Sequence, residues 1–226
     1  MTRIDFDVVA FDLDGTLADT APDLTASLNH TLRTLGRDPI PEARVRHLVG
    51  HGARALIRRG LTETGTAAEE LVEEGFPIFI DYYADHICEG TRPYDGVEEA
   101  LDVLAARGVA LAICTNKPEA LTFALLEALG WTDRFRGIVG ADTLPVRKPD
   151  PAPLREAIAR AGGGPAAFVG DSITDADTAR AAAIPLIAVS FGFSDRPVEA
   201  LGADAVIDHY RELLPALERL PARKAA

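Results

Sequence analysis

The sequence has few cysteines, few aromatic residues and no long apolar run. Two cysteines among 226 residues, Cys88 and Cys114, do not form a disulfide scaffold, and a chain of this length buries roughly 70% of its unfolded surface without one. No apolar run approaches the roughly 18 residues that span a bilayer. The first residues lack the basic-then-apolar pattern of a secretory signal. We therefore expect a cytoplasmic protein with no membrane partner.

Positive charge is also scarce. The chain has 23 Lys and Arg against 35 Asp and Glu, and its formal net charge is −12. This balance argues against nucleic acid or an anionic membrane surface as a partner. If the protein binds a phosphate group, it must place cations locally against its own negative field.

Two kinds of phosphate-binding loop are absent as well. No G-x-G-x-x-G pattern follows the first apolar run, which disfavours a dinucleotide-binding fold. The glycine run 162–164 precedes an expected strand and does not open a helix, so we interpret it as a loop. There is no internal repeat and no low-complexity tract.

What the sequence does have is an acidic turn after a short apolar run. Residues 8–11 form the run, which reads as a strand buried on both faces. Asp12 and Asp14 follow, and Gly15 turns the chain out of the sheet. A carboxylate and a nearby backbone carbonyl then converge, as a hard divalent cation requires. A single Asp in such a turn would be ordinary, but the pair followed by Asp19 is more specific.

The next section of the chain has helical periodicity only. Leucines at four positions from Leu24 to Leu35 share one helix face, and Gly36 ends that helix. Pro77 is expected to kink or divide the longest segment. The expected helices lie at 22–35, from about 42, at 53–59 and at 67–88.

From Gly96 onward, apolar runs alternate with helical segments. Strand–helix alternation predicts a parallel sheet with helices on both faces. The expected helices are 97–107, 119–129, 151–161, 176–183 and 210–220, and the expected strands are 109–114, 137–140, 166–169, 185–189 and 205–207.

The spacing of the first two strands indicates an insertion. An ordinary strand–helix–strand unit takes about 30 residues, whereas Asp12 and Thr115 are about 100 residues apart, so about 70 residues are surplus. We predict an α/β protein with a doubly wound, Rossmann-like parallel sheet and an inserted all-helical cap. The core comprises residues 1–19 and 91–226, and the cap residues 20–90.

Polar residues follow several of the expected strands. Ligands of doubly wound sheets bind at the carboxyl ends of the strands. Each residue alone has a structural explanation: Thr115 as a helix cap, Lys148 as a solvated charge, Asp171 as a cap and Asp175 as a first-turn acid. Their joint occurrence at one sheet edge favours a functional site. The set is Asp12, Asp14, Thr115, Asn116, Lys148, Asp171 and Asp175.

These stretches resemble a known family. The sequence Asp12-Leu-Asp14-Gly-Thr16-Leu is similar to the first motif of the haloacid dehalogenase-like phosphohydrolases, and residues 21–24 resemble the phosphoglycolate phosphatase branch. The other three motifs have counterparts in Thr115-Asn116, in Lys148 and in 170–175. The resemblance covers nearly the whole chain.

The resemblance implies a mechanism. Asp12 would be the nucleophile that forms an aspartyl-phosphate, and Asp14 the general acid and base. Mg²⁺ would be held by Asp12, Asp171 and the Asp14 carbonyl, with Asp175 behind them. Lys148 would add positive charge beside Asp12. Thr115 and the Asn116 backbone N–H would bind phosphate oxygens.

The cap stretch 49–54 is the candidate for choosing the substrate. Two glycines flank His51, which indicates a close backbone approach or a hinge, and His51 is expected to face the ligand. Arg54 has the geometry to pair with a substrate carboxylate. It fits an exposed basic helix face equally well, because two further arginines follow it.

The expected function is Mg²⁺-dependent hydrolysis of a small phosphate ester, 2-phosphoglycolate above all. A sugar phosphatase and a phosphohexose mutase of the same superfamily are the nearest alternatives. A metal-free 2-haloacid dehalogenase would leave Asp14, Asp171 and Asp175 without a purpose. A phosphoacceptor signalling module combines similar residues, but such modules are about half this length. The sequence does not indicate an oligomeric state.

Overall fold

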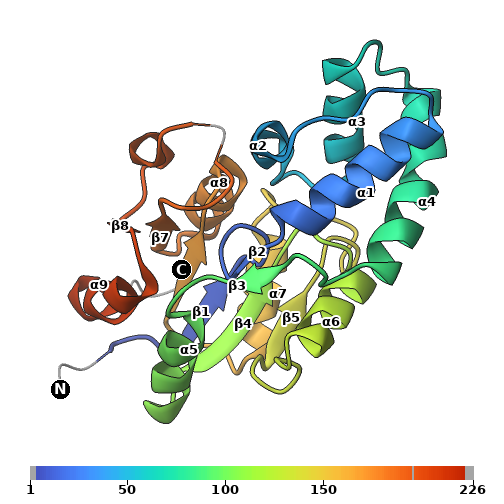
Figure 1. The fold of residues 1–226 in the computed structure, drawn as a ribbon. Coiled ribbons are helices and arrows are strands. Elements are labelled where there is room, and N and C mark those ends of the chain that lie inside the picture. Colours follow the sequence, from blue (N-terminus) through green and yellow to red (C-terminus); the bar gives the residue numbers. More distant parts are fainter. Residues whose placement is uncertain (1–3, 195, 222–226) are drawn as a thin grey trace.

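A six-stranded parallel sheet forms the centre of the molecule (Figure 1). The computed structural model describes residues 4–194 and 196–221, so residues 1–3, 195 and 222–226 of the predicted core lie outside the described residues. The strand order is β5-β4-β1-β6-β7-β8. The strands are β1 (Val8–Phe11), β4 (Ala110–Cys114), β5 (Gly137–Val139), β6 (Ala166–Gly170), β7 (Leu186–Val189) and β8 (Ala205–Ile207).

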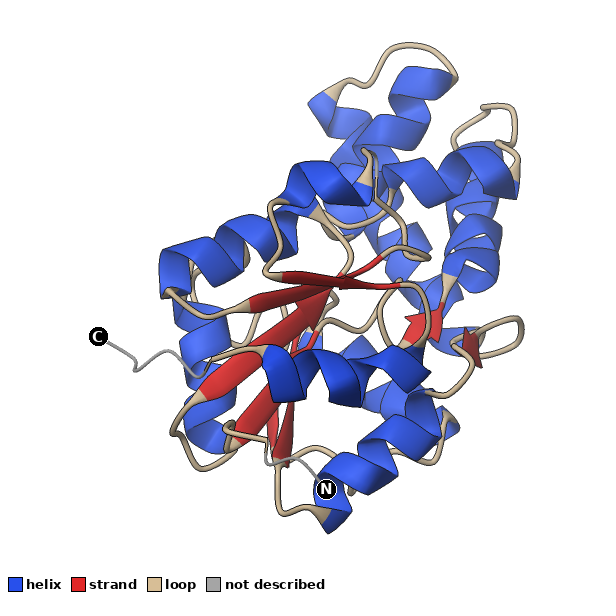
Figure 2. Ribbon diagram, turned by 90° about the vertical axis from the view of Figure 1, so that its left-hand side faces the viewer, coloured by secondary structure: helices blue, strands red, loops and turns tan. Residues whose placement is uncertain are grey.

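Strand β1 lies in the middle of the sheet and is buried on both faces. Val9 and Phe11 pack into one apolar cluster, and Val8 and Ala10 into another, as the two-residue period of a strand requires. Helices α5 (Val97–Ala106), α6 (Glu119–Ala128) and α9 (Leu213–Arg219) contribute to the first cluster, and α7 (Ala152–Arg160) and α8 (Ile173–Ala182) to the second. The predicted doubly wound sheet, with helices on both faces, is therefore confirmed (Figure 2).

A helical section, which we call the cap, is inserted after β1 and stands above the strand ends (Figure 1). It has its own apolar cluster, to which Leu28, Leu61 and Phe79 contribute. Its elements are α1 (Ala21–Thr34), α2 (Glu42–Val45), the 3-10 turn η1 (Arg46–Leu48), α3 (Ala53–Glu63) and α4 (Glu69–Asp85).

The two chain segments that join the cap to the sheet pair with each other. Strands β2 (Ala18–Asp19) and β3 (Arg92–Pro93) form a short antiparallel ladder. The sequence pattern did not predict this ladder, because two residues are too few to show a period. The pairing keeps the entry and exit of the cap side by side.

Several elements differ from the sequence-based expectations. Pro77 lies inside α4, which remains one helix of 17 residues; the packing of α4 against α1 and α3 outweighs the missing hydrogen bond. Helix α8 begins at Ile173 instead of 176, because Ser172 and Asp175 form a capping box at its start. The closing segment divides into the 3-10 turn η3 (Tyr210–Glu212) and α9, and a further 3-10 turn, η2 (Val198–Leu201), precedes β8.

Asp23 connects the first cap helix to the exit of the cap. Its buried carboxylate accepts hydrogen bonds from Gly90 N at 2.7 Å, Thr91 N at 2.8 Å and Thr91 Oγ1 at 2.6 Å. Hydrogen bonds to a charged group stabilise more than neutral ones do, and donors left unpaired in a buried site are costly. Asp23 therefore helps to hold the connection between the cap and the sheet.

We expect Asp23→Ala to lower the free energy of unfolding by about 2–4 kcal/mol, because it leaves these donors unpaired. Urea unfolding followed by circular dichroism measures this change. The matched control is Asp81→Ala, at an exposed position of α4, with an expected effect within about 0.5 kcal/mol. Equal effects of the two substitutions would contradict the role of Asp23.

Candidate active site

The acidic turn lies at the carboxyl end of the central strand. Asp12 follows β1 directly and is buried, and the Leu13 N–H donates to its Oδ1 at 2.7 Å. Gly15 has a φ of +82°, and a Cβ at this position would lie 2.5 Å from Asp171 Oδ2. Only glycine allows this turn to pass so close to the neighbouring strand end.

A buried lysine lies between two of the carboxylates. Lys148 Nζ is 3.1 Å from Asp12 Oδ1 and 2.6 Å from Asp175 Oδ1. The Lys148 and Asp175 side chains are almost completely buried. Lys148 comes from the loop between β5 and α7, so only the folded chain brings it to the end of β1.

Asp171 and Asp175 come after β6, which pairs with β1 on the side opposite β4. Asp171 Oδ1 accepts a hydrogen bond from Thr16 Oγ1 at 3.0 Å, and its Oδ2 accepts one from Phe193 N at 2.6 Å. Asp175 Oδ2 accepts from the backbone N–H and the hydroxyl of Ser172. Both oxygens of Asp175 therefore have protein donors, one from the helix cap and one from Lys148.

Asp12, Asp171 and Asp175 form a cluster that has room for a cation. Each offers one carboxylate oxygen, and these three atoms lie within 4.8 Å of one another. Oxygen donors of this type at this spacing fit a hard divalent cation. Lys148 supplies one positive charge against three carboxylates, so a cation would improve the charge balance.

Burial changes the acidity of this cluster. It raises the pKa of Asp12 to about 7, although Lys148 acts in the opposite direction. Burial and the neighbouring Asp175 also raise the pKa of Asp171 well above its ordinary range. Burial opposes the charge of Lys148, but Asp12 and Asp175 together raise its pKa, so the ammonium stays charged.

Thr115 and Asn116 follow β4 and are buried beside the acidic turn. Thr115 Oγ1 accepts a hydrogen bond from the Lys117 backbone N–H at 3.2 Å. Asn116 Nδ2 donates to the Lys148 carbonyl at 3.2 Å. The structure thus brings together the seven core residues that the sequence singled out, from three neighbouring strand ends and one loop.

The two cap candidates have different surroundings. His51 Nδ1 lies 3.1 Å from Thr174 Oγ1 of α8, so His51 is at the contact between cap and sheet. Gly52 has a φ of +85°, and a Cβ there would lie 3.2 Å from the Asn116 carbonyl, so the close backbone approach predicted from the glycines is observed. The Arg54 guanidinium donates two hydrogen bonds to the Glu73 carboxylate. Its central carbon lies 3.6 Å from the centre of the Phe76 ring.

A cavity of about 40 Å³ lies between the strand ends and the cap. Neither His51 nor Arg54 is among its lining residues. Its floor contains Asp12, Asp14 and the residues after β4, and its walls are apolar side chains of the cap and of α6. The lining residues are Asp12, Asp14, Leu24, Val49, Gly50, Gly52, Ala53, Leu56, Phe79, Tyr83, Thr115, Asn116, Lys117, Pro118 and Leu121.

Sequence reasoning missed two polar residues of this cavity. Lys117 Nζ donates to Asp14 Oδ1 at 2.9 Å and contacts the Tyr83 hydroxyl at 2.5 Å. The only sequence signal for Lys117 was its place directly after Thr115 and Asn116. Tyr83 looked like any other member of the apolar face of its helix.

A profile of the haloacid dehalogenase-like hydrolases matches residues 6–183. The chain belongs to this family. It is therefore an enzyme of the hydrolase class, and the resemblance predicted from the motifs is confirmed.

Individual relatives agree with this assignment along almost the whole chain. A phosphoglycolate phosphatase of Mesorhizobium japonicum is 48% identical over 94% of this chain and 96% of its own length. A phosphoglycolate phosphatase of Agrobacterium fabrum is 44% identical over 96% of this chain and 94% of its own length. A crystal structure from Haemophilus somnus, described as a predicted phosphoglycolate phosphatase, is 30% identical and superimposes with a TM-score of 0.87 over 93% of this chain and 97% of that one.

No helix within the described residues has the length and apolar character needed to cross a membrane.

The raised pKa of Asp12 predicts a pH-dependent stability in the absence of divalent cations. The ordinary value is 3.8 and the folded value about 7, so the folded chain keeps its proton over a pH range in which the unfolded chain loses it. Asp12 therefore lowers the free energy of unfolding progressively as the pH rises from about 4 to about 7. Below this range both states are protonated, and the penalty is absent.

Urea unfolding in EDTA, at several pH values across this range, tests the prediction. We expect Asp12→Asn to gain stability relative to the unsubstituted protein as the pH rises. Asp81→Asn, at an exposed position, is expected to follow the unsubstituted protein throughout. A constant difference between Asp12→Asn and the unsubstituted protein over the whole range would show that Asp12 ionises normally.

Proposed function

We propose that this protein is a Mg²⁺-dependent phosphatase that hydrolyses 2-phosphoglycolate to glycolate and phosphate through an aspartyl-phosphate on Asp12. The observation that carries the proposal is the buried set of Asp12, Asp171, Asp175 and Lys148 at the strand ends. The relatives from Mesorhizobium and Agrobacterium, both named phosphoglycolate phosphatase, support the choice of substrate.

The donor set fits Mg²⁺, which prefers a few carboxylate and carbonyl oxygens and keeps several waters. We assign Asp12, Asp171 and the Asp14 backbone carbonyl as its protein ligands. Asp175 is assigned a supporting role, in which its carboxylate pairs with the Lys148 ammonium and caps α8 through Ser172. When bound, the cation supplies positive charge to the phosphoryl oxygens and reduces their repulsion from Asp12.

In the first step, a carboxylate oxygen of Asp12 attacks phosphorus in line with the ester oxygen. The new O–P bond forms as the ester O–P bond breaks, and Asp14 gives its proton to the leaving alkoxide. Lys148 holds a positive charge at 3.1 Å from Asp12. The Thr115 hydroxyl and the Asn116 backbone N–H bind the remaining phosphoryl oxygens.

In the second step, Asp14 takes a proton from water, and the resulting hydroxide attacks the phosphorus of the aspartyl-phosphate. The bond to Asp12 breaks, and inorganic phosphate leaves with the carboxylate restored. We propose residues 20–90 as the cap domain that excludes bulk water during both steps, and residues 1–19 and 91–226 as the catalytic domain. His51, at the contact between them, is a candidate for sensing cap closure over the substrate.

Phosphate release from a panel of esters tests this function. The panel contains 2-phosphoglycolate, hexose 6-phosphates and an aromatic ester, each with Mg²⁺ and with EDTA. We expect strong turnover of 2-phosphoglycolate that requires Mg²⁺. Efficient hydrolysis of hexose phosphates alone would indicate a sugar phosphatase, and transfer of the phosphoryl group within a sugar would indicate a mutase.

We also expect Asp12→Asn to lower kcat by at least about 1,000-fold, because it removes the nucleophile. The fold should be retained, since the amide is the same size as the carboxylate; circular dichroism checks this. The control Asp81→Asn, at an exposed position of α4, should keep full activity. Retention of most activity by Asp12→Asn would disprove the nucleophile assignment.

A further inference from the structure

One buried cation at the cavity takes part in none of the steps above. Lys117 is 4% exposed, and its ammonium contacts Asp14 Oδ1 at 2.9 Å and the Tyr83 hydroxyl at 2.5 Å. It is the one positively charged side chain among the described residues that line the cavity. Lys148, the other lysine of the site, is engaged by Asp12 and Asp175.

We propose that Lys117 recognises a second anionic group of the substrate, a carboxylate on the carbon that carries the phosphate ester, and that Tyr83 of the cap completes this subsite. The assignment rests on the proposed function and names the residues that set its specificity. Lys117 is thus a substrate-binding residue, distinct from the residues that carry out phosphoryl transfer.

The position of Asp14 places the carboxylate next to Lys117. In the proposed reaction the leaving oxygen lies at the Asp14 carboxyl, and in 2-phosphoglycolate only two bonds separate this oxygen from the carboxylate carbon. The ammonium in contact with Asp14 is therefore within reach of the carboxylate. An ammonium has three N–H donors; Asp14 and Tyr83 take two, and the third can serve the substrate.

The charges around the site favour such a cation. Asp12, Asp14, Asp171 and Asp175 already place four carboxyl groups around the reacting centre, and an anionic leaving group is repelled by any that are ionised. The cavity walls are apolar and screen little, so one ammonium has a larger effect there than in water. An ester of the same size without a carboxylate lacks this pairing with Lys117.

The size of the cavity limits what can accompany the phosphate. A volume of about 40 Å³ accommodates only a few water-sized groups. A small leaving group therefore suits this space better than a hexose does.

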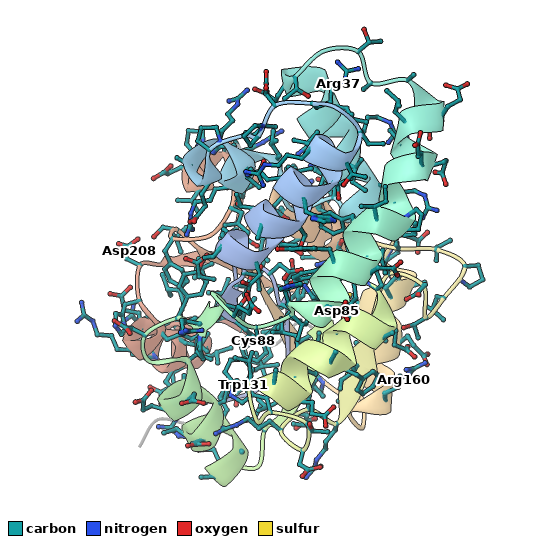
Figure 3. The ribbon with its side chains drawn as sticks, turned by 45° about the vertical axis from the view of Figure 1, so that its right-hand side comes forward. Arg37, Asp85, Cys88, Trp131, Arg160 and Asp208 are labelled. Carbon is teal, nitrogen blue, oxygen red and sulfur yellow. The ribbon has the colours of Figure 1, made fainter. Side chains whose placement is uncertain are left out.

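Tyr83 makes recognition depend on the cap. It belongs to the end of α4 that meets the sheet domain; Asp85, two residues further on, is labelled there in Figure 3. Lys117 belongs to the loop after β4. The contact between them joins the two parts of the molecule, so the subsite is complete only when the cap covers the strand ends.

The test compares 2-phosphoglycolate with 2-hydroxyethyl phosphate, which replaces the carboxylate by a neutral hydroxymethyl group. Values of kcat/KM are measured for both esters with the unsubstituted protein and with Lys117→Met, Lys117→Arg, Tyr83→Phe, Arg54→Gln and Arg58→Gln. Arg58 is the matched control, because it lies on α3 like Arg54 and pairs with Glu69. Circular dichroism checks that each variant is folded.

We expect Lys117→Met to lower the preference for 2-phosphoglycolate over the neutral ester by about 10- to 100-fold, the size of one hydrogen bond to a charged group. Lys117→Arg should restore part of this preference, because it keeps the charge. Tyr83→Phe should lower it in the same direction by a smaller factor. Arg58→Gln should leave the preference unchanged.

A parallel loss for both esters in Lys117→Met would overturn the proposal, because it would mean that Lys117 only positions Asp14 or supports the fold. A loss of preference in Arg54→Gln instead of Lys117→Met would assign the carboxylate to Arg54. If the unsubstituted protein shows no preference for 2-phosphoglycolate, the proposed substrate is wrong.

In that case, competitive inhibition of aromatic ester hydrolysis by glycolate tests the carboxylate subsite independently. Weaker inhibition of Lys117→Met than of the unsubstituted protein supports the subsite, and equal inhibition rejects it.

Discussion

The site depends on the ammonium of Lys148 between the carboxylates of Asp12 and Asp175. Two buried carboxylates so close together would repel each other, and a single buried charge without a partner would be unstable. The lysine resolves both problems, because its Nζ is 3.1 Å from one and 2.6 Å from the other. Asp175 also caps α8 through Ser172, so the same interaction connects the end of β1 to the start of a helix.

The acidic cluster of the site carries more carboxylates than cations: Asp12, Asp171 and Asp175 lie together, and Lys148 is the lysine that pairs with them. Burial raises the pKa of Asp12, the negative charges of Asp175 and Asp14 raise it further, and Lys148 offsets only part of this effect. A bound cation and the phosphoryl group of a substrate together fit such a site, because one supplies the charge that the other requires. In the proposed function, the globally acidic chain thus binds an anion through the local arrangement of its charges.

The cap meets the site through polar contacts as well as through the apolar walls of the cavity. Gly52 approaches the Asn116 carbonyl, His51 lies against Thr174 of α8, and Tyr83 contacts Lys117. The apolar cluster of the cap is otherwise its own, with Leu121 as its contribution from α6. Polar contacts between two separately packed parts are typical of elements that open and close over a ligand.

The sequence alone predicted the architecture, because buried strands and amphipathic helices have periods that are visible over a few residues. The surplus of about 70 residues after the first strand identified the helical insertion, since a strand–helix–strand unit has a known length. The sequence also predicted that Asp12, Asp14 and Asp171 lie at one sheet edge, because each comes directly after a strand of one parallel sheet. Lys148 instead comes from the loop between β5 and α7, and the folded chain brings it to this edge.

Features that depend on contacts between distant segments were not accessible in this way. The β2–β3 ladder is too short to produce a pattern, and the continuity of α4 through Pro77 results from packing against α1 and α3. Sequence pointed to Arg54 as a carboxylate-binding candidate, whereas the folded chain pairs it with Glu73 and places Lys117 in the cavity. Local sequence thus determined which residue types are available at each strand end. Only the tertiary structure decided which charges face one another, because charge pairing depends on the distances between segments that folding brings together.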